Sequence, residues 1–176
     1  EVEELYRTLA NSSPVGVYIV QDRKFRFVNP QFQEITGYTE DELLDIDSLS
    51  IVHPEDRQRV RQNAVEMLKG KRLSPYEFRV IGKGGETIWA IETVTSIHYK
   101  GKRATLGNFM DITERKRMEQ ELRERNEQLD AQNEELQLQA EELMAQQQEL
   151  IERTREVERA TLAKSEFLAG MSHDLR

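Results

Sequence analysis

His173 has the clearest capacity for chemistry, because an exposed imidazole is a nucleophile near neutral pH. A seven-residue repeat of apolar residues leads up to it. In that register Leu168 and Leu175 fall at position a and Met171 at position d, while His173 falls at f, the outermost position. The sequence therefore predicts a helix that buries these apolar residues and presents one imidazole to solvent.

The other segments that could do chemistry have simpler explanations. His53 directly precedes Pro54, which predicts a helix cap rather than a haem ligand, and His98 is expected to be an ordinary residue near a strand end. The run Gly82-Lys83-Gly84-Gly85 lies between two predicted strands, which indicates a hairpin rather than a phosphate loop. There is no Cys, which excludes disulfides and flavin sensing through a thiol adduct, and no metal site is predicted.

Composition narrows the class of protein. The 176 residues carry a net charge of -8, which argues against nucleic acid or an anionic membrane surface as the main partner. No run approaches the roughly 18 consecutive apolar residues of a membrane-spanning helix. A cytoplasmic location fits these features. The first residue is not Met, which indicates a piece of something longer that could be membrane-attached through absent segments.

The chain has two unlike halves that meet near residue 111. All four prolines, eight of nine glycines and eleven of twelve aromatic residues lie before this point. Residues 1–110 have a net charge of -1 and residues 111–176 a net charge of -7. The first half can bury a mixed core, whereas the second half needs a partner for its apolar residues.

The second half predicts a parallel two-stranded coiled coil. Placing the heptad leucines at d puts Asn126 and Asn133 at a, where paired Asn side chains satisfy one another only in register. The polar a layer weakens the dimer, which suits a rod that shifts between states. The d positions are Leu122, Leu129, Leu136, Leu143, Leu150 and Val157.

The first half predicts two strands, a cluster of helices and three more strands. Alternation predicts strands over residues 15–20, 24–28, 75–81 and 87–99, and a last strand through Phe109. A helix is expected over residues 2–11. Later helices are expected to start at three capping sequences, Asn29-Pro30, Thr39-Glu40-Asp41-Glu42 and His53-Pro54. This order is an α+β domain, a five-stranded antiparallel sheet with helices on one face.

The ordered set of motifs over about residues 3–113 resembles a PAS domain. The resemblance rests on Asn29-Pro30, Thr36-Gly37-Tyr38, Val52-His53-Pro54-Glu55-Asp56-Arg57, Tyr76-Glu77-Phe78-Arg79 and Asp111-Ile112-Thr113. It implies a sheet and helices that can enclose a small ligand, and dimerisation through the first helix. Because the heptad register continues without interruption from Ile112 to Leu175, we expect the signal to leave the domain through Asp111, Ile112 and Thr113. From alternation and family position, the inner-face residues that could bind a ligand are Val17, Ile19, Ile35, Ile51, Val60 and Phe78.

Residues 164–176 resemble the start of the phosphoacceptor box of sensor histidine kinases, with Met171-Ser172-His173-Asp174 as the most specific piece. The resemblance implies that His173 attacks the γ-phosphate of ATP and later passes the phosphoryl group to a response regulator. Asp174 then matches the acid that orients the imidazole, and Arg176 a basic residue of the box. The Thr-Pro that normally follows and the ATP-binding domain are absent, so the fragment alone is expected to bind neither ATP nor Mg²⁺ and to be inactive.

The sequence thus predicts a PAS sensor domain over residues 1–113, a dimeric coiled-coil linker over 114–163 and a truncated phosphoacceptor domain over 164–176. The expected partners are a second copy, an ATP-binding kinase domain and a response regulator. The PAS ligand is not identified by sequence. Two alternatives remain, a non-enzymatic PAS dimerisation scaffold and a PAS regulator of another output domain.

Overall fold

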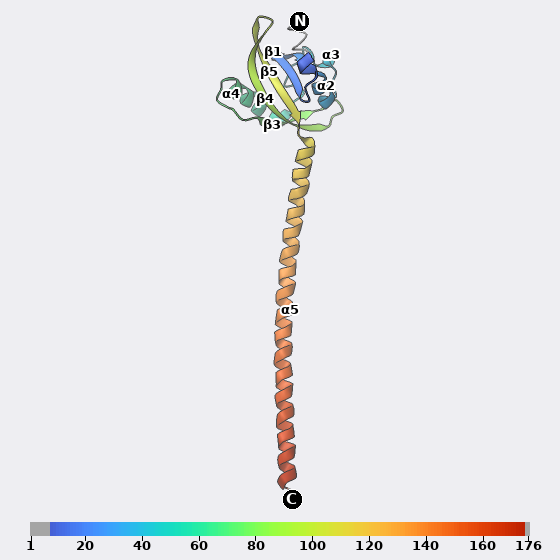
Figure 1. Cartoon of the computed structure of the whole chain (residues 1–176), viewed down its shortest axis with the longest axis vertical. Coiled ribbons are helices and arrows are strands. Elements are labelled where there is room, and N and C mark those ends of the chain that lie inside the picture. Colours follow the sequence, from blue (N-terminus) through green and yellow to red (C-terminus); the bar gives the residue numbers. More distant parts are fainter. Residues whose placement is uncertain (1–7, 175–176) are drawn as a thin grey trace. The chain divides into compact units, whose positions relative to one another are not determined.

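The computed structural model describes residues 8–174, and from Ser172 onward it describes the helical backbone alone (Figure 1). Contacts divide the chain into two units, Glu1–Glu119 and Gln120–Arg176. The first unit holds the sheet and the short helices. The second is part of one long helix.

The first unit is built on a five-stranded antiparallel sheet of order β2-β1-β5-β4-β3, which confirms the predicted sheet. Its two outer strands, β2 and β3, follow one another in the chain, so the segment with the helices between them crosses from one edge of the sheet to the other. The strands are β1 (Gly16–Gln21), β2 (Lys24–Val28), β3 (Tyr76–Ile81), β4 (Thr87–Tyr99) and β5 (Lys102–Asp111).

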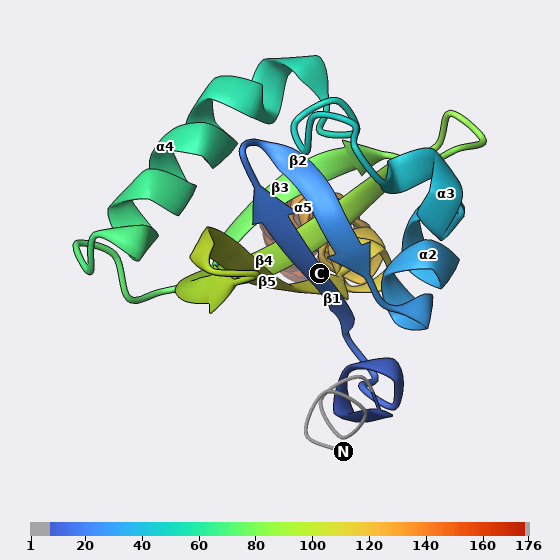
Figure 2. The same ribbon diagram turned by 90° about the horizontal axis from the view of Figure 1, so that it is seen from above.

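The helices between β2 and β3 begin at the expected capping sequences. Asn29 caps α2 (Pro30–Thr36), where its Oδ1 accepts from the backbone N–H of Phe32 at 2.9 Å. In α3 (Glu40–Leu43) the Glu42 carboxylate accepts from the N–H of Thr39 at 3.0 Å. His53 precedes a 3₁₀ turn, η1 (Pro54–Asp56), which leads into α4 (Arg57–Leu68). Figure 2 shows α4 well separated from α2 and α3.

One apolar core lies between the inner face of the sheet and these helices. Strand residues such as Tyr18, Phe78 and Phe109 share it with Phe32 of α2 and Leu43 of α3. Tilted and edge-to-face ring contacts join Phe32 to Phe109 at 5.0 Å and Phe109 to Phe78 at 6.2 Å between centroids. The helices therefore cover one face of the sheet, as predicted.

The two ends of the described chain are helical. Residues 8–11 are helical, and the rest of the helix expected over residues 2–11 lies outside the described residues. The long helix expected after residue 111 is confirmed as α5 (Thr113–Asp174). Among residues 8–174, no helix is long and apolar enough to cross a membrane.

Candidate functional site

A cavity of about 720 Å³ lies between α4 and the inner face of the sheet. Apolar side chains from α4 and from strands β1, β3, β4 and β5 line most of it. Three of the predicted inner-face residues, Ile51, Val60 and Phe78, are among them. The volume falls within the roughly 300–1,000 Å³ of typical small-molecule sites.

The other three predicted inner-face residues do not line this cavity. The prediction for Val17 and Ile19 is wrong by one position, because Tyr18 and Val20 of β1 point inward instead. Residues 15–20 are apolar on both sides, so alternation alone did not fix the face. Ile35 packs against the core and borders a smaller pocket beside Pro14.

A buried carboxylate, missed by the sequence interpretation, lies at the wall of the cavity. Glu92 of β4 is 5% exposed, and two tyrosine hydroxyls donate to it, Tyr18 at 2.7 Å and Tyr76 at 2.5 Å. Gly107 makes room for this arrangement, because a Cβ there would lie 2.1 Å from the Tyr18 ring. The detectable signal was a charged residue at an inward position between Ala90 and Val94.

Burial sets the protonation of this cluster. It raises the pKa of Glu92 to about 7, although the hydrogen bonds from Tyr76 and Tyr18 act in the opposite direction. Burial and the nearby carboxylate also raise the pKa of both tyrosines. Glu92 therefore titrates near neutral pH, and its ionised form carries a charge in the core.

We expect Glu92→Gln to stabilise the protein at pH 8 and to have little effect at pH 5. Between pH 4.5 and about 7 the folded carboxyl binds more protons than the unfolded one, so the free energy of unfolding of the parent falls as pH rises through this window. The amide avoids this loss, which amounts to about 3 kcal/mol at pH 8. Urea unfolding at both pH values measures it. Glu34→Gln, on the exposed surface of α2, is the control, and identical pH profiles for parent and Glu92→Gln would contradict the assignment.

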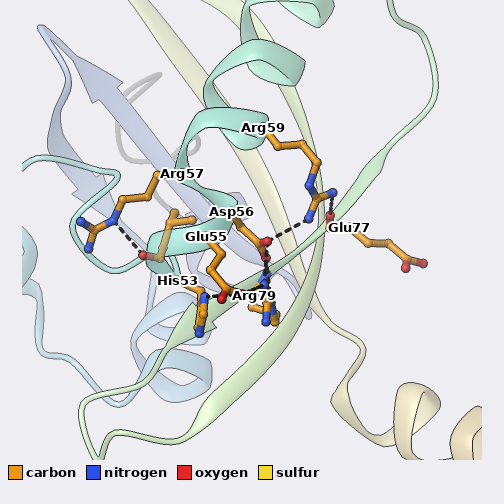
Figure 3. Close-up of polar contacts among 8 residues, drawn as sticks. His53, Glu55, Asp56, Arg57, Arg59, Glu77 and Arg79 are labelled. Carbon is orange, nitrogen blue, oxygen red and sulfur yellow. Dashed lines mark hydrogen bonds and ion pairs between the residues drawn. The ribbon is translucent and has the colours of Figure 1, made fainter.

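A network of charges fastens the start of α4 to strand β3 (Figure 3). The side chain of Asp56 is 7% exposed and accepts from Arg79 through its backbone N–H at 2.9 Å, Nε at 3.0 Å and a terminal nitrogen at 2.9 Å. Arg59 lies 3.3 Å from the same carboxylate, and Glu55 also pairs with Arg79 at 2.9 Å. The bonds from Arg79 hold the pKa of Asp56 well below its usual range, so this stabilisation is lost only as pH falls below about 4.

The same strand continues the network to the start of α5. Arg79 and Lys116 each lie over the Trp89 ring, at 5.8 and 5.3 Å from its centroid. Glu77, two residues before Arg79 on β3, pairs with Lys116 at 2.6 Å and also with Arg115. Trp89, which sequence could not place, therefore lies on the outer face of the sheet beside α5.

The predicted signal junction is hydrogen-bonded to β4, an inner strand of the sheet. Ile112 is buried, and its N–H donates to the carbonyl of Trp89 at 2.8 Å. The N–H of Trp89 donates to Thr113 Oγ1 at 3.0 Å, and Asp111 Oδ1 accepts from the N–H of Thr113 at 2.7 Å. Asp111, Ile112 and Thr113 thus fix the first turn of α5 to β4.

The remaining predicted site residues lie on α5 or beyond it. Asn126 and Asn133 are exposed on the helix. His173 and Asp174 lie in its last turn, where the backbone alone is described, and Arg176 lies outside the described residues.

Comparisons with known proteins agree with this geometry. Residues 25–106 match the family described as PAS fold. The sensor histidine kinase TmoS of Ectopseudomonas mendocina is 28% identical over 124 residues, which are 68% of this chain and 13% of TmoS. The sensor protein TdiS of Thauera aromatica is 26% identical over 121 residues, 67% of this chain and 22% of TdiS. The chain thus spans a small part of these relatives.

A solved structure extends the comparison. The sensory box histidine kinase/response regulator of Burkholderia thailandensis E264 is 28% identical with a TM-score of 0.53, and the alignment covers 73% of this chain and 98% of that one. The sheet, the helices and the match over residues 25–106 show that the first unit has the PAS fold. Its PAS domain is similar to those of sensor histidine kinases, which confirms the resemblance seen in the sequence.

Proposed function

We propose that the chain is the sensory and signal-transmitting region of a two-component sensor histidine kinase, acting in the cytoplasm. PAS input enters α5 at the junction, and a parallel coiled coil of two copies relays it to His173. The observation that carries the proposal is the continuity of α5. It is one helix from Thr113 to Asp174, bonded to the sheet at its first turn and bearing an exposed row of apolar residues.

That row, the leucine seam, consists of the d-position residues. In the single chain they are 49–66% exposed. Burying one such side chain contributes roughly 1.5–3 kcal/mol, so a second copy that covers the seam would be strongly favoured. The members are Leu122, Leu129, Leu136, Leu143, Leu150 and Val157.

The polar a positions favour two parallel helices in register. Asn126 and Asn133 meet their own counterparts only in that arrangement, where the amides bond to each other. In an antiparallel pair each Asn would face a leucine at d, and in a parallel pair shifted by one heptad only one Asn126–Asn133 pairing would remain, so buried amides would lose their partners.

Flanking charges favour the same arrangement. In a parallel dimer, a residue at g lies beside the e residue of the following heptad on the other helix. Arg125 at g then meets Asp130 at e, and Arg153 at g meets Glu158 at e. Both pairs join opposite charges, and each forms twice in a symmetric dimer.

The chemistry at the end of the rod follows from the resemblance of residues 164–176. In that scheme a kinase domain outside these residues holds ATP with Mg²⁺, and His173 accepts a phosphoryl group from the ATP. A response regulator then receives the phosphoryl group from His173. Asp174 orients the imidazole. The competing scaffold function would use the same dimer without phosphoryl transfer.

A cysteine cross-link tests the dimer directly, because the chain has no Cys of its own. Thr161 occupies position a far from the middle of α5, so two copies of Thr161→Cys meet only in a parallel, in-register pair. We expect mild oxidation to convert most of the 20.6 kDa chain into a covalent dimer of twice that mass. Non-reducing electrophoresis measures the yield.

Arg159→Cys is the matched control, since position f faces away from the partner helix. This variant should form no covalent dimer under the same oxidation and should migrate as the single chain. Equal cross-linking of both variants, or none in Thr161→Cys, would contradict the parallel coil.

A further inference from the structure

The lining of the cavity beneath α4 combines apolar side chains with three exposed basic residues, Arg61, Lys69 and Arg103. Val60, Ala64 and Leu68 of α4 face Val94 and Ala104 of the sheet across it. These α4 residues range from buried to half-buried, so the helix does not pack fully onto the sheet. An apolar body could enter here without displacing the aromatic core.

The polar residues of the lining are unevenly charged. Arg61 of α4, Lys69 directly after α4 and Arg103 of β5 line the cavity, and no ion pair engages them within residues 8–174. Arg23 also reaches it but pairs with Asp47 at 2.7 Å.

Two acids oppose these cations. Asp22 lies in the β1–β2 turn and is exposed, and Glu92 lies inside, where both oxygens accept from tyrosines. Three cations of the lining without an ion pair among residues 8–174 stand out in a chain of net charge -8.

We propose that this cavity binds a free, monomeric amphiphile with an anionic head and an apolar body, such as a medium-chain carboxylate. The head lies at Arg61, Lys69 and Arg103, and the body lies between α4 and the sheet. This inference rests on the proposed sensory function and names the chemical class of its ligand.

The position of the cavity connects such a ligand to the output. The body would contact α4, whose start is held by Asp56 on Arg79. Arg79 shares the Trp89 ring with Lys116 of α5. A ligand that shifts α4 therefore acts on the contacts that hold the first turn of α5.

Titration of the full chain with decanoate, decan-1-ol and decylamine, each below its micelle concentration, tests the head-group charge. We expect decanoate to bind about tenfold more tightly than decan-1-ol and decylamine to bind most weakly, with the difference shrinking at high salt. Replacing Arg61, Lys69 and Arg103 together by Gln should lower the affinity for decanoate to that for decan-1-ol. Isothermal titration calorimetry measures the affinity for each of the three probes.

A charge-matched variant controls for the overall loss of positive charge. It replaces three exposed cations outside the cavity lining by Gln and should bind decanoate like the parent; these are Lys24, Lys71 and Lys102. Ala64→Phe should weaken decanoate and decan-1-ol alike by about tenfold, since it fills the space for the body, and a thermal melt verifies its fold.

Equal affinity for the acid and the alcohol, tighter binding of decylamine, or no binding of any probe would overturn the proposal. Sedimentation with phosphatidylglycerol vesicles but no binding of free decanoate would overturn it too, because the ligand would then be a membrane lipid. The Thr161→Cys cross-link, measured in the same preparations, tests the proposed dimer separately from the proposed ligand. An intact cross-link without decanoate binding refutes the ligand and leaves the relay standing.

Discussion

Replacing His173 by Gln is expected to abolish phosphorylation of the chain when a histidine-kinase catalytic domain is fused after Arg176 and supplied with ATP and Mg²⁺. The neutral imidazole has a nucleophilic nitrogen near pH 7, and the Gln amide has none. The parent fusion should gain radiolabelled phosphate that is lost in acid and survives alkali, as a phosphohistidine does. The variant should gain none above background.

Two further variants sharpen this result. His98→Gln changes an exposed histidine of β4 and should leave the labelling unchanged. Asp174→Asn should slow labelling about a hundredfold without removing the acceptor, because the acid assists deprotonation of the imidazole. Full labelling of His173→Gln would favour the scaffold function instead.

Local signals in the sequence located the elements of the fold well. Asn29-Pro30 predicts the start of α2 because the Asn caps the free N–H groups and the Pro needs none. The Asn29 side chain does more than capping requires. It is fully buried and also bonds to Val17 and Val15 of the first strand region and to Ala10. Those contacts link distant segments, so no local pattern predicts them.

The errors in the candidate site also come from contacts between residues that are distant in the sequence. Val17 and Ile19 were placed inward because residues 15–20 are apolar on both sides, and the face is decided by Tyr18 reaching Glu92 from 74 residues away. Glu92 itself interrupts the inward row of β4, which marks it as unusual but does not name its tyrosine partners. The bonds between Asp56 and Arg79 likewise depend on how α4 crosses to β3.

The role of the junction motif depends on residues that are distant in the sequence. Asp111-Ile112-Thr113 is recognisable in the sequence, but its anchoring depends on Trp89, which binds Ile112 and Thr113 through its backbone and Lys116 through its ring. A change in the sheet at Trp89 therefore acts on the direction in which α5 leaves the domain. The proposed relay requires that the coil preserve that change as a rotation or a shift of register.

Deleting residues 140–143 is expected to change the phosphorylation of His173 in the same fusion by about tenfold or more, within the usual range of coupling between sites. The deletion joins a g position to an e position, so the helix beyond it is turned by roughly 50° relative to the leucine seam before it. His173 would then face a different direction relative to the kinase domain. Steady-state radiolabel incorporation, with and without the PAS ligand, measures the effect.

Deleting residues 137–143 is the matched control, because it removes a whole heptad and joins Leu136 at d to Met144 at e. It shortens the helix by about 10 Å, more than the roughly 6 Å lost in the shorter deletion. The larger deletion should nevertheless keep phosphorylation within about twofold of the parent, because the phase of the heptads is preserved. The two deletions thereby separate the effect of helix length from that of heptad register. Equal phosphorylation of the two deletion variants would show that α5 acts as a tether. A larger effect of the seven-residue deletion would show that the distance to His173 matters more than its direction.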